Sequence, residues 1–100
     1  MNEEQLKAAM KAIETEVFTI KDSKAETYAP PFYAKNKFDA MRNVEAWVND
    51  PKYGNLASHP EDFTIFAIGT FNPSNGLLDG YKETVSIINC AELSKKQKEI

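Results

Sequence analysis

The residues best suited to chemistry lie in one segment, residues 21–42, where Tyr28, Phe32 and Tyr33 are interleaved with basic side chains. Single-stranded nucleic acid is bound by aromatic faces on which bases stack and by cations that follow the phosphates. The segment has five basic and three acidic residues, a local excess of two positive charges. It therefore predicts a nucleic-acid contact formed by Lys21, Lys24, Tyr28, Phe32, Tyr33, Lys35, Lys37 and Arg42.

The same composition also fits a structural role. Aromatic residues beside prolines commonly pack a loop onto a core, and lysines commonly keep edge strands from pairing. Pro30 and Pro31 supply no backbone donors and favour extended geometry, so the stretch is expected to cross the surface in polyproline-like form. Two interpretations stay open: a contact surface for something anionic and flat, or a clamp that holds a small core shut.

Charge and hydropathy narrow the class of protein. The chain has 100 residues, 42% hydrophobic and 27% charged, which is typical of a single soluble domain. Its net charge of -3 gives no general attraction for nucleic acid, so any such binding must be local. No apolar run approaches the ~20 residues that span a bilayer, and the chain starts with acidic residues. We therefore expect no membrane association and a cytoplasmic location.

Residues for catalysis or metal binding are few. The single histidine, His59, precedes a proline, and the single cysteine, Cys90, has apolar neighbours that predict a buried thiol. One His and one Cys cannot form a usual zinc site, and the acidic pairs Asp22 with Glu26 and Glu61 with Asp62 are typical of solvated side chains. The sequence thus predicts neither an enzyme nor a bound metal or cofactor.

Two helices are expected. Residues 2–15 carry Asn2 as N-cap and an apolar stripe at helical spacing, which predicts an amphipathic N-terminal extension over residues 1–15. That stripe could cover the domain or pair with its copy in another subunit. A second helix is expected from Asp39, as N-cap, to Asn49, where Asp50 and Pro51 end it.

Three strands are expected. The first begins at residue 16 and ends near 26, and Phe63–Phe71 is apolar on both alternating faces, as in an interior strand. A turn at residues 72–76 leads into a third strand that is interrupted at Asp79 and Gly80 and ends at Ile88. These elements predict an α+β domain over residues 16–91, with a small, mainly antiparallel sheet of about three strands covered by one helix. Residues 92–100 are expected to form a flexible, lysine-containing tail.

Several short motifs follow one another between residues 17 and 78. They are Asp22-Ser23-Lys24-Ala25-Glu26, Pro30-Pro31-Phe32, Val48-Asn49-Asp50-Pro51, His59-Pro60-Glu61-Asp62, Ile68-Gly69 and Asn75-Gly76. In this combination the chain resembles the small nonstructural protein of gokushoviruses, a subfamily of the Microviridae, which are bacteriophages with circular single-stranded DNA genomes.

The resemblance implies a DNA-binding protein made during infection and absent from the mature shell. It implies a role in viral replication, at the switch from duplex synthesis to single-stranded genomes for packaging. It supplies no catalytic residues, and residues 1–15 depart from the family pattern. Together with the aromatic segment it predicts a homodimer in the host cell cytoplasm that binds single-stranded DNA with little sequence preference. The alternative is a protein-interaction module that docks on a phage capsid or replication protein through its N-terminal helix or an exposed sheet edge.

Overall fold

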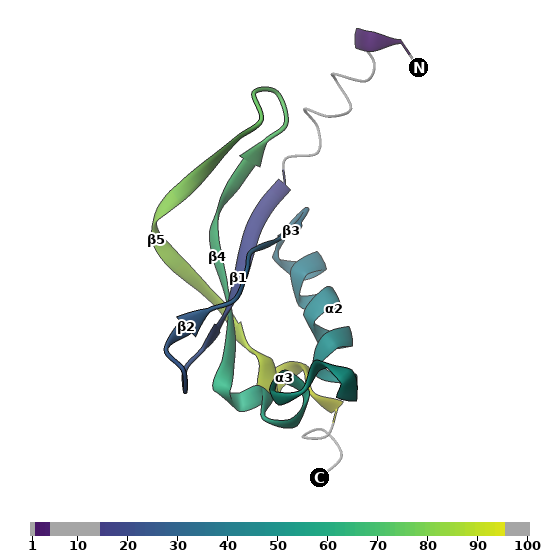
Figure 1. Ribbon diagram of the computed structural model, residues 1–100. Helices are drawn as coiled ribbons and strands as arrows, with labels where there is room; N and C mark the ends of the chain where they lie inside the picture. Colours follow the sequence, from purple (N-terminus) through teal and green to yellow (C-terminus); the bar gives the residue numbers. More distant parts are fainter. Residues whose placement is uncertain (1, 5–14, 96–100) are drawn as a thin grey trace.

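The computed structural model describes residues 2–4 and 15–95, and it shows one antiparallel sheet with helices on one side (Figure 1). Four strands lie in the order β2, β1, β4, β5, and β3 pairs with the same edge of β1 as β2. The strands are β1 (Thr15–Asp22), β2 (Thr27–Tyr28), β3 (Phe32–Ala34), β4 (Phe63–Asn72) and β5 (Leu77–Asn89). The helical elements are α2 (Lys37–Val48), η1 (Pro51–Tyr53), α3 (Asn55–Ser58), η2 (Pro60–Asp62) and η3 (Cys90–Leu93).

The predicted α+β class is confirmed, but the sheet has five strands instead of about three. The additional strands β2 and β3 come from the segment that we expected to run as a loop. Thr27–Tyr28 and Phe32–Ala34 are rich in strand-forming residues and pair with β1, whereas Pro30 and Pro31 between them lack the donors for pairing. Residues 5–14 of the expected N-terminal helix and residues 96–100 of the expected tail lie outside the described residues.

Helix α2 begins three residues earlier than predicted, at Lys37, because its N-cap is Asn36 and not Asp39. The Asn36 side chain accepts a hydrogen bond from the backbone N–H of Asp39 at 2.9 Å, so Asp39 lies in the first turn. Ala40, Val44 and Val48 are buried against the sheet. Between α2 and β4 the chain forms the short helical turns η1, α3 and η2.

The hydrophobic core lies between α2 and one face of the sheet, the helix face. Phe18, Val44 and Ile65 have no exposed surface, and the predicted burial of Cys90 is confirmed by an exposure of 0%. The core continues past the boundary expected at residue 91, because Leu93 and Ser94 are also buried.

Strand β4 is interior, as predicted, and it contains one extra residue. Val17 of β1 pairs with Gly69 and Phe18 pairs with Ala67, so Ile68 has no partner on β1. Such a bulge reverses which face the following side chains occupy. On the other side of β4, residues 81–84 of β5 lie opposite Ile68 alone. The larger irregularity of β5 thus follows Gly80, whereas we expected an interruption at Asp79 and Gly80, and a smaller one leaves Ile87 unpaired between Ser86 and Ile88.

The Tyr81 side chain attaches this irregular segment of β5 to β1. Its hydroxyl donates a 2.6 Å hydrogen bond to Glu16 Oε2 on β1. This hydrogen bond, together with partial desolvation and the negative charge of Glu16, raises the pKa of Tyr81 to about 12. The phenol is a hydrogen-bond donor at neutral pH and links β5 to β1 across β4.

Gly69 is required where β4 and β5 approach. A Cβ at this position would overlap the carbonyl oxygen of Asp79, a backbone atom that cannot move aside alone. At Gly80, its partner on β5, no atom of the described residues lies within 4 Å of the corresponding Cβ position.

Because of this difference, we expect Gly69→Ala to lower the free energy of unfolding by about 1–3 kcal/mol through steric overlap. Gly80→Ala is the matched control and should change it by no more than about 0.5 kcal/mol. Urea denaturation of both variants measures the two values. Equal effects at the two positions would contradict the close approach.

Burial also makes stability depend on pH through Cys90. Desolvation raises the pKa of its thiol from 9.0 to about 12, so the folded chain keeps a proton that the unfolded chain loses. The free energy of unfolding should then fall above about pH 9, by up to about 1.4 kcal/mol per pH unit. Denaturation of the wild type and Cys90→Ala from about pH 7 to about pH 10 isolates this slope. Parallel pH profiles of the two proteins would show that the thiol does not contribute.

Candidate nucleic-acid interface

The three aromatic residues of the predicted contact divide between the two faces of the sheet. Phe32 pairs with Phe18 and lies on the helix face, where its ring is 5.9 Å from the Phe18 ring and 5.2 Å from the Trp47 ring. Tyr28 pairs with Lys21 and Tyr33 pairs with Val17, so both tyrosines belong to the opposite face. Phe32 therefore packs in the core, and the tyrosines do not.

The face opposite α2, which we call the open face, carries two matching aromatic pairs. The Tyr28 ring lies 5.9 Å from the Phe66 ring at an interplanar angle of 71°. The Tyr33 ring lies 6.2 Å from the Phe71 ring at 74°. Both tyrosines are about half exposed, at 49% and 51%, and both phenylalanines are partly buried. Each tyrosine is thus held edge-on by a phenylalanine of the central strand while keeping exposed ring surface.

Two breaks in regular strand geometry bring these pairs to one face. Phe66 and Phe71 are five residues apart, and side chains at an odd separation in a regular strand point to opposite faces. The extra residue Ile68 restores Phe71 to the face of Phe66. Tyr28 and Tyr33 are also five residues apart, and the unpaired stretch between β2 and β3 has the same effect.

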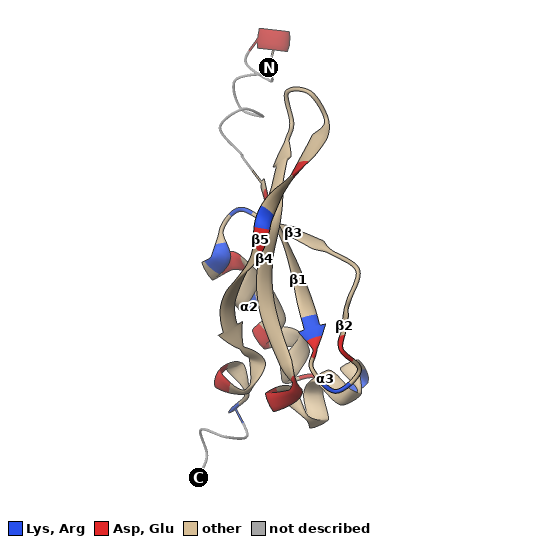
Figure 2. Ribbon diagram, turned by 90° about the vertical axis from the view of Figure 1, so that its left-hand side faces the viewer, with Lys and Arg blue, Asp and Glu red and all other residues tan. Residues whose placement is uncertain are grey.

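The strand register also separates the charges. Lys21 lies on the open face, with its Nζ 5.6 Å from the centre of the Tyr28 ring. Glu16, Asp22 and Asp79 are placed by the register on the helix face. Among the described residues that the register assigns to the open face, Lys21 is the single charged side chain. In Figure 2, which views the molecule from this side, most of the ribbon is tan, with blue and red bands on β5, where the register leaves residues 81–84 without individual partners on β4.

The other basic residues of the predicted contact are dispersed. Lys24 lies in the exposed turn between β1 and β2, at the same end of β1 as Lys21. Lys35 and Lys37 are exposed at the junction of β3 and α2. Arg42 is on the solvent side of α2, so the helix and the sheet separate it from the open face. The predicted residues thus do not form one groove.

Sequence reasoning missed Phe66 and Phe71 as part of the candidate interface. Their signal was present, because β4 is apolar on both alternating faces. We interpreted that pattern as a sign of an interior strand, which is correct for its position between β1 and β5. The same pattern also indicates aromatic side chains on the open face, outside the core, which are Phe66 and Phe71.

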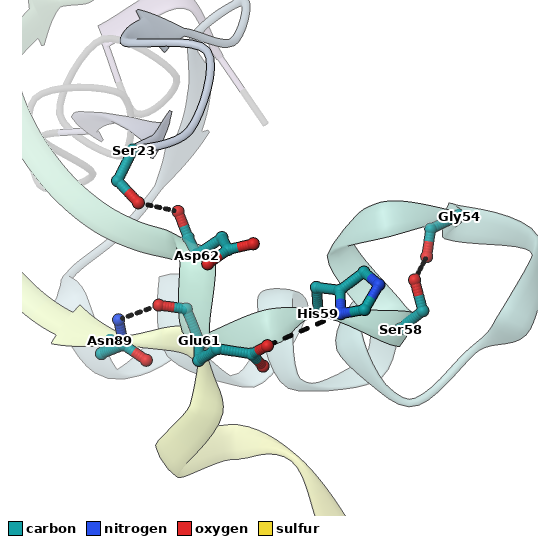
Figure 3. Close-up of polar contacts among 7 residues, drawn as sticks. All are labelled: Ser23, Gly54, Ser58, His59, Glu61, Asp62 and Asn89. Atoms are coloured by element: carbon teal, nitrogen blue, oxygen red, sulfur yellow. Dashed lines mark hydrogen bonds and ion pairs between the residues drawn. The ribbon is translucent and has the colours of Figure 1, made fainter.

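Two of the motifs meet at the start of β4 (Figure 3). The Ser23 backbone N–H and hydroxyl both donate to the Asp62 carbonyl oxygen at 2.9 Å. On the other side, Asn89 Nδ2 donates to the Glu61 carbonyl oxygen at 3.0 Å. His59 makes an exposed contact of 3.6 Å from Nδ1 to Glu61 Oε1. Ser23 and Asn89 thus hold the ends of β1 and β5 against η2, which is a structural role.

A third motif, Val48-Asn49-Asp50-Pro51, joins α2 to the segment after β5 through the Asn49 side chain. Asn49 Nδ2 donates to the carbonyl oxygens of Glu45 at 2.8 Å and Leu93 at 3.0 Å. Asn49 Oδ1 accepts from the backbone N–H of Lys95 at 2.9 Å. One side chain thereby joins the end of α2 to the segment that follows β5.

The described residues contain no cluster of three or more His, Cys, Asp or Glu side chains that could hold a metal ion. Within the same residues, no helix has the length and apolar character needed to cross a membrane.

Comparison with known proteins gives one match. A sequence model of the family described as Phage ORF5 protein matches residues 15–93, which includes every strand and α2. Neither curated proteins nor solved structures yield a match to this chain.

The contacts of Asn49 predict the effect of removing its donors. In Asn49→Asp the new carboxylate would keep the acceptor for Lys95 and would face two carbonyl oxygens without a proton to donate. We expect a loss of about 1–3 kcal/mol in the free energy of unfolding at neutral pH, and a smaller loss at acidic pH, where the carboxyl regains a proton.

The matched control is Asn75→Asp. Asn75 Oδ1 accepts from the backbone N–H of Leu77 at 2.9 Å, a role that a carboxylate also fills. This variant should stay within about 0.5 kcal/mol of the wild type. Chemical denaturation at neutral and acidic pH measures the free energy of unfolding of both variants and of the wild type. If Asn49→Asp were as stable as Asn75→Asp at neutral pH, the donated hydrogen bonds would be unimportant.

Proposed function

Because the chain belongs to the Phage ORF5 protein family, we propose that it is a non-enzymatic DNA-binding protein of a bacteriophage, with single-stranded DNA as its ligand. The family provides the phage context. The resemblance to gokushovirus proteins supports single-stranded DNA as the nucleic acid and a role in replication, or in the switch to single-stranded genome synthesis and packaging. The proposed site of action is the cytoplasm of the host cell.

One observation carries this proposal: two half-exposed tyrosines share an open sheet face with a lysine. Tyr28 and Tyr33 are each supported from the side by a phenylalanine, so their rings are held in place before a ligand arrives. Stacking on such rings contributes about 1–3 kcal/mol per base. Because Lys21 is within 5.6 Å of the Tyr28 ring centre, a base on Tyr28 would bring its phosphate near a cation.

The chemistry of the open face favours a single strand over a duplex. Rings accept only bases that have left the stack, and a single strand offers them at little energetic expense. The Thr19 hydroxyl, which lies on this face, already donates to the Ala29 carbonyl oxygen at 2.7 Å. With stacking dominant and few polar groups facing the bases, binding should show little sequence preference.

The charge of the protein limits the affinity. A chain with a net charge of -3 relies on local cations, and within the described ranges these are Lys21 and Lys24 at the Tyr28 end of the open face. One or two phosphate contacts give a shallow salt dependence, with a logarithmic slope of about -0.7 to -1.4 for a single strand. A homodimer, which we also propose, would present two such faces and raise the affinity through linked sites.

Binding of a fluorescent thymidine oligonucleotide, measured by anisotropy at several salt concentrations, tests the proposal. Tyr28→Leu and Tyr33→Leu retain apolar bulk but remove the aromatic ring, and each should weaken binding by between about 5-fold and about 150-fold. Lys21→Gln should weaken binding and reduce the salt slope by about 0.7.

Arg42→Gln is the matched control, because it removes the same charge from the far side of α2. It should leave the affinity within about twofold of the wild type. Absence of binding at low salt would reject the proposal. So would an Arg42→Gln effect as large as that of Lys21→Gln, because the cation would then act only through net charge.

A protein-interaction role is the second candidate, and the β4–β5 hairpin favours it. Leu77 and Leu78 are 62% and 58% exposed, and β5 is an edge strand. A capsid or replication protein of the phage could contact this surface. Capture of partners from infected cells with and without nuclease separates the two candidates, because partners retained after nuclease treatment support a direct protein contact.

A further inference from the structure

Resting on the proposed function, we infer that the open face binds three consecutive nucleotides, with the first and third bases stacked on Tyr28 and Tyr33 and the middle base on neither. The inference concerns the spacing of two stacking positions, one at each tyrosine. It depends on the geometry of β1, which both tyrosines flank through β2 and β3.

The spacing follows from the register. Tyr28 is opposite Lys21 and Tyr33 is opposite Val17, so the two positions are four residues apart along β1. A strand rises about 3.3 Å per residue, which separates the positions by about 13 Å. The extra residue of this region is on β4, so β1 itself runs without interruption from Val17 to Lys21.

The two positions are alike in construction. Each consists of a tyrosine from the edge of the sheet that meets a phenylalanine of β4 at nearly the same angle, 71° for Tyr28 and 74° for Tyr33. Thr19 lies between them on β1 and is 2% exposed, with its hydroxyl already bonded. At the middle of the site β1 therefore offers a base neither a ring nor a free polar group, and Phe66, opposite Thr19 on β4, is partly buried and packs against Tyr28.

Nucleotide dimensions convert this spacing into a number of bases. A stacked strand advances ~3.4 Å per nucleotide, but two bases that stack on separate rings cannot stack on each other. Stretched to about twice that rise, the strand covers about 13 Å in two steps. The bases on the two tyrosines are then the first and third of three.

The ends of the site differ, and this favours a nucleic acid as the occupant. At the Tyr28 end, Lys21 supplies a cation, and Lys24 lies in the turn beyond it. At the Tyr33 end, Phe71 has Leu78 as its register partner on β5. A phosphate is thus attracted at one end, while a base and sugar meet apolar surface at the other.

A set of trinucleotides tests the inference without altering the protein. The parent is trithymidylate, and three analogues each lack one base while keeping the sugar and phosphates. Binding is followed by NMR from the shifts of the tyrosine ring signals. We expect loss of the middle base to change Kd by less than about twofold, and loss of either end base to raise Kd about 5-fold or more.

Tyr28→Leu provides a cross-check on the assignment of positions. In this variant one end base should lose its effect on Kd, whereas the other should keep it, because only the Tyr33 position remains. Tyr33→Leu should show the reverse pattern. A middle base that matters as much as the end bases, or a dithymidylate that binds as tightly as trithymidylate, would overturn the three-nucleotide spacing.

A longer oligonucleotide distinguishes failure of the spacing from failure of the proposed function. If 15-mer thymidylate binds with dependence on both tyrosines while the middle base of the trinucleotide matters, only the spacing is wrong. If the 15-mer does not bind at low salt, the proposed function and the inference fail together.

Discussion

The reversal of side-chain direction at Ile68 is the constraint on which the candidate interface depends. If Ile68 were paired with β1 as in a regular strand, Phe71 would point toward the helix face and Tyr33 would lose its aromatic neighbour on the open face. Directly after Ile68, Gly69 lets the backbone of β5 approach β4, because a Cβ there would overlap the Asp79 carbonyl oxygen. One inserted residue and one missing side chain thus decide whether two aromatic pairs, or only one, share a face.

The neighbouring strands accommodate this irregularity in different ways. Strand β5 places residues 81–84 opposite Ile68, and the hydrogen bond from Tyr81 to Glu16 holds this segment to β1. Strand β1 remains regular, and the chain beyond it divides into β2 and β3 around two prolines. The core lies on the helix face, and the aromatic pairs lie on the open face. Phe32 packs into the core, whereas its neighbour Tyr33 does not. Packing and surface chemistry are therefore assigned to alternate residues of the same short strand.

Much of the fold was predictable because its signals are local. The apolar run of β4, the Asn75-Gly76 turn and the proline after α2 act within a few residues of where they stand. The two- and three-residue strands β2 and β3 were not predictable, because they exist only through pairing with β1. For the same reason, alternation alone would have grouped Tyr28 with Phe32, whereas the structure groups it with Tyr33. The tyrosines were identifiable from composition, but their phenylalanine partners depend on a register that no local pattern encodes.

The tie between Asn49 and the segment after β5 has a consequence for how the chain acquires its native state during synthesis. The end of α2 is bonded to Leu93 and Lys95, and the core includes Cys90 and Leu93. The ribosome must therefore release nearly the whole domain before the end of α2 can form its hydrogen bonds to Leu93 and Lys95. Until residue 95 has been released, the end of α2 lacks these hydrogen-bond partners, so the domain does not complete its core in stages along its synthesis.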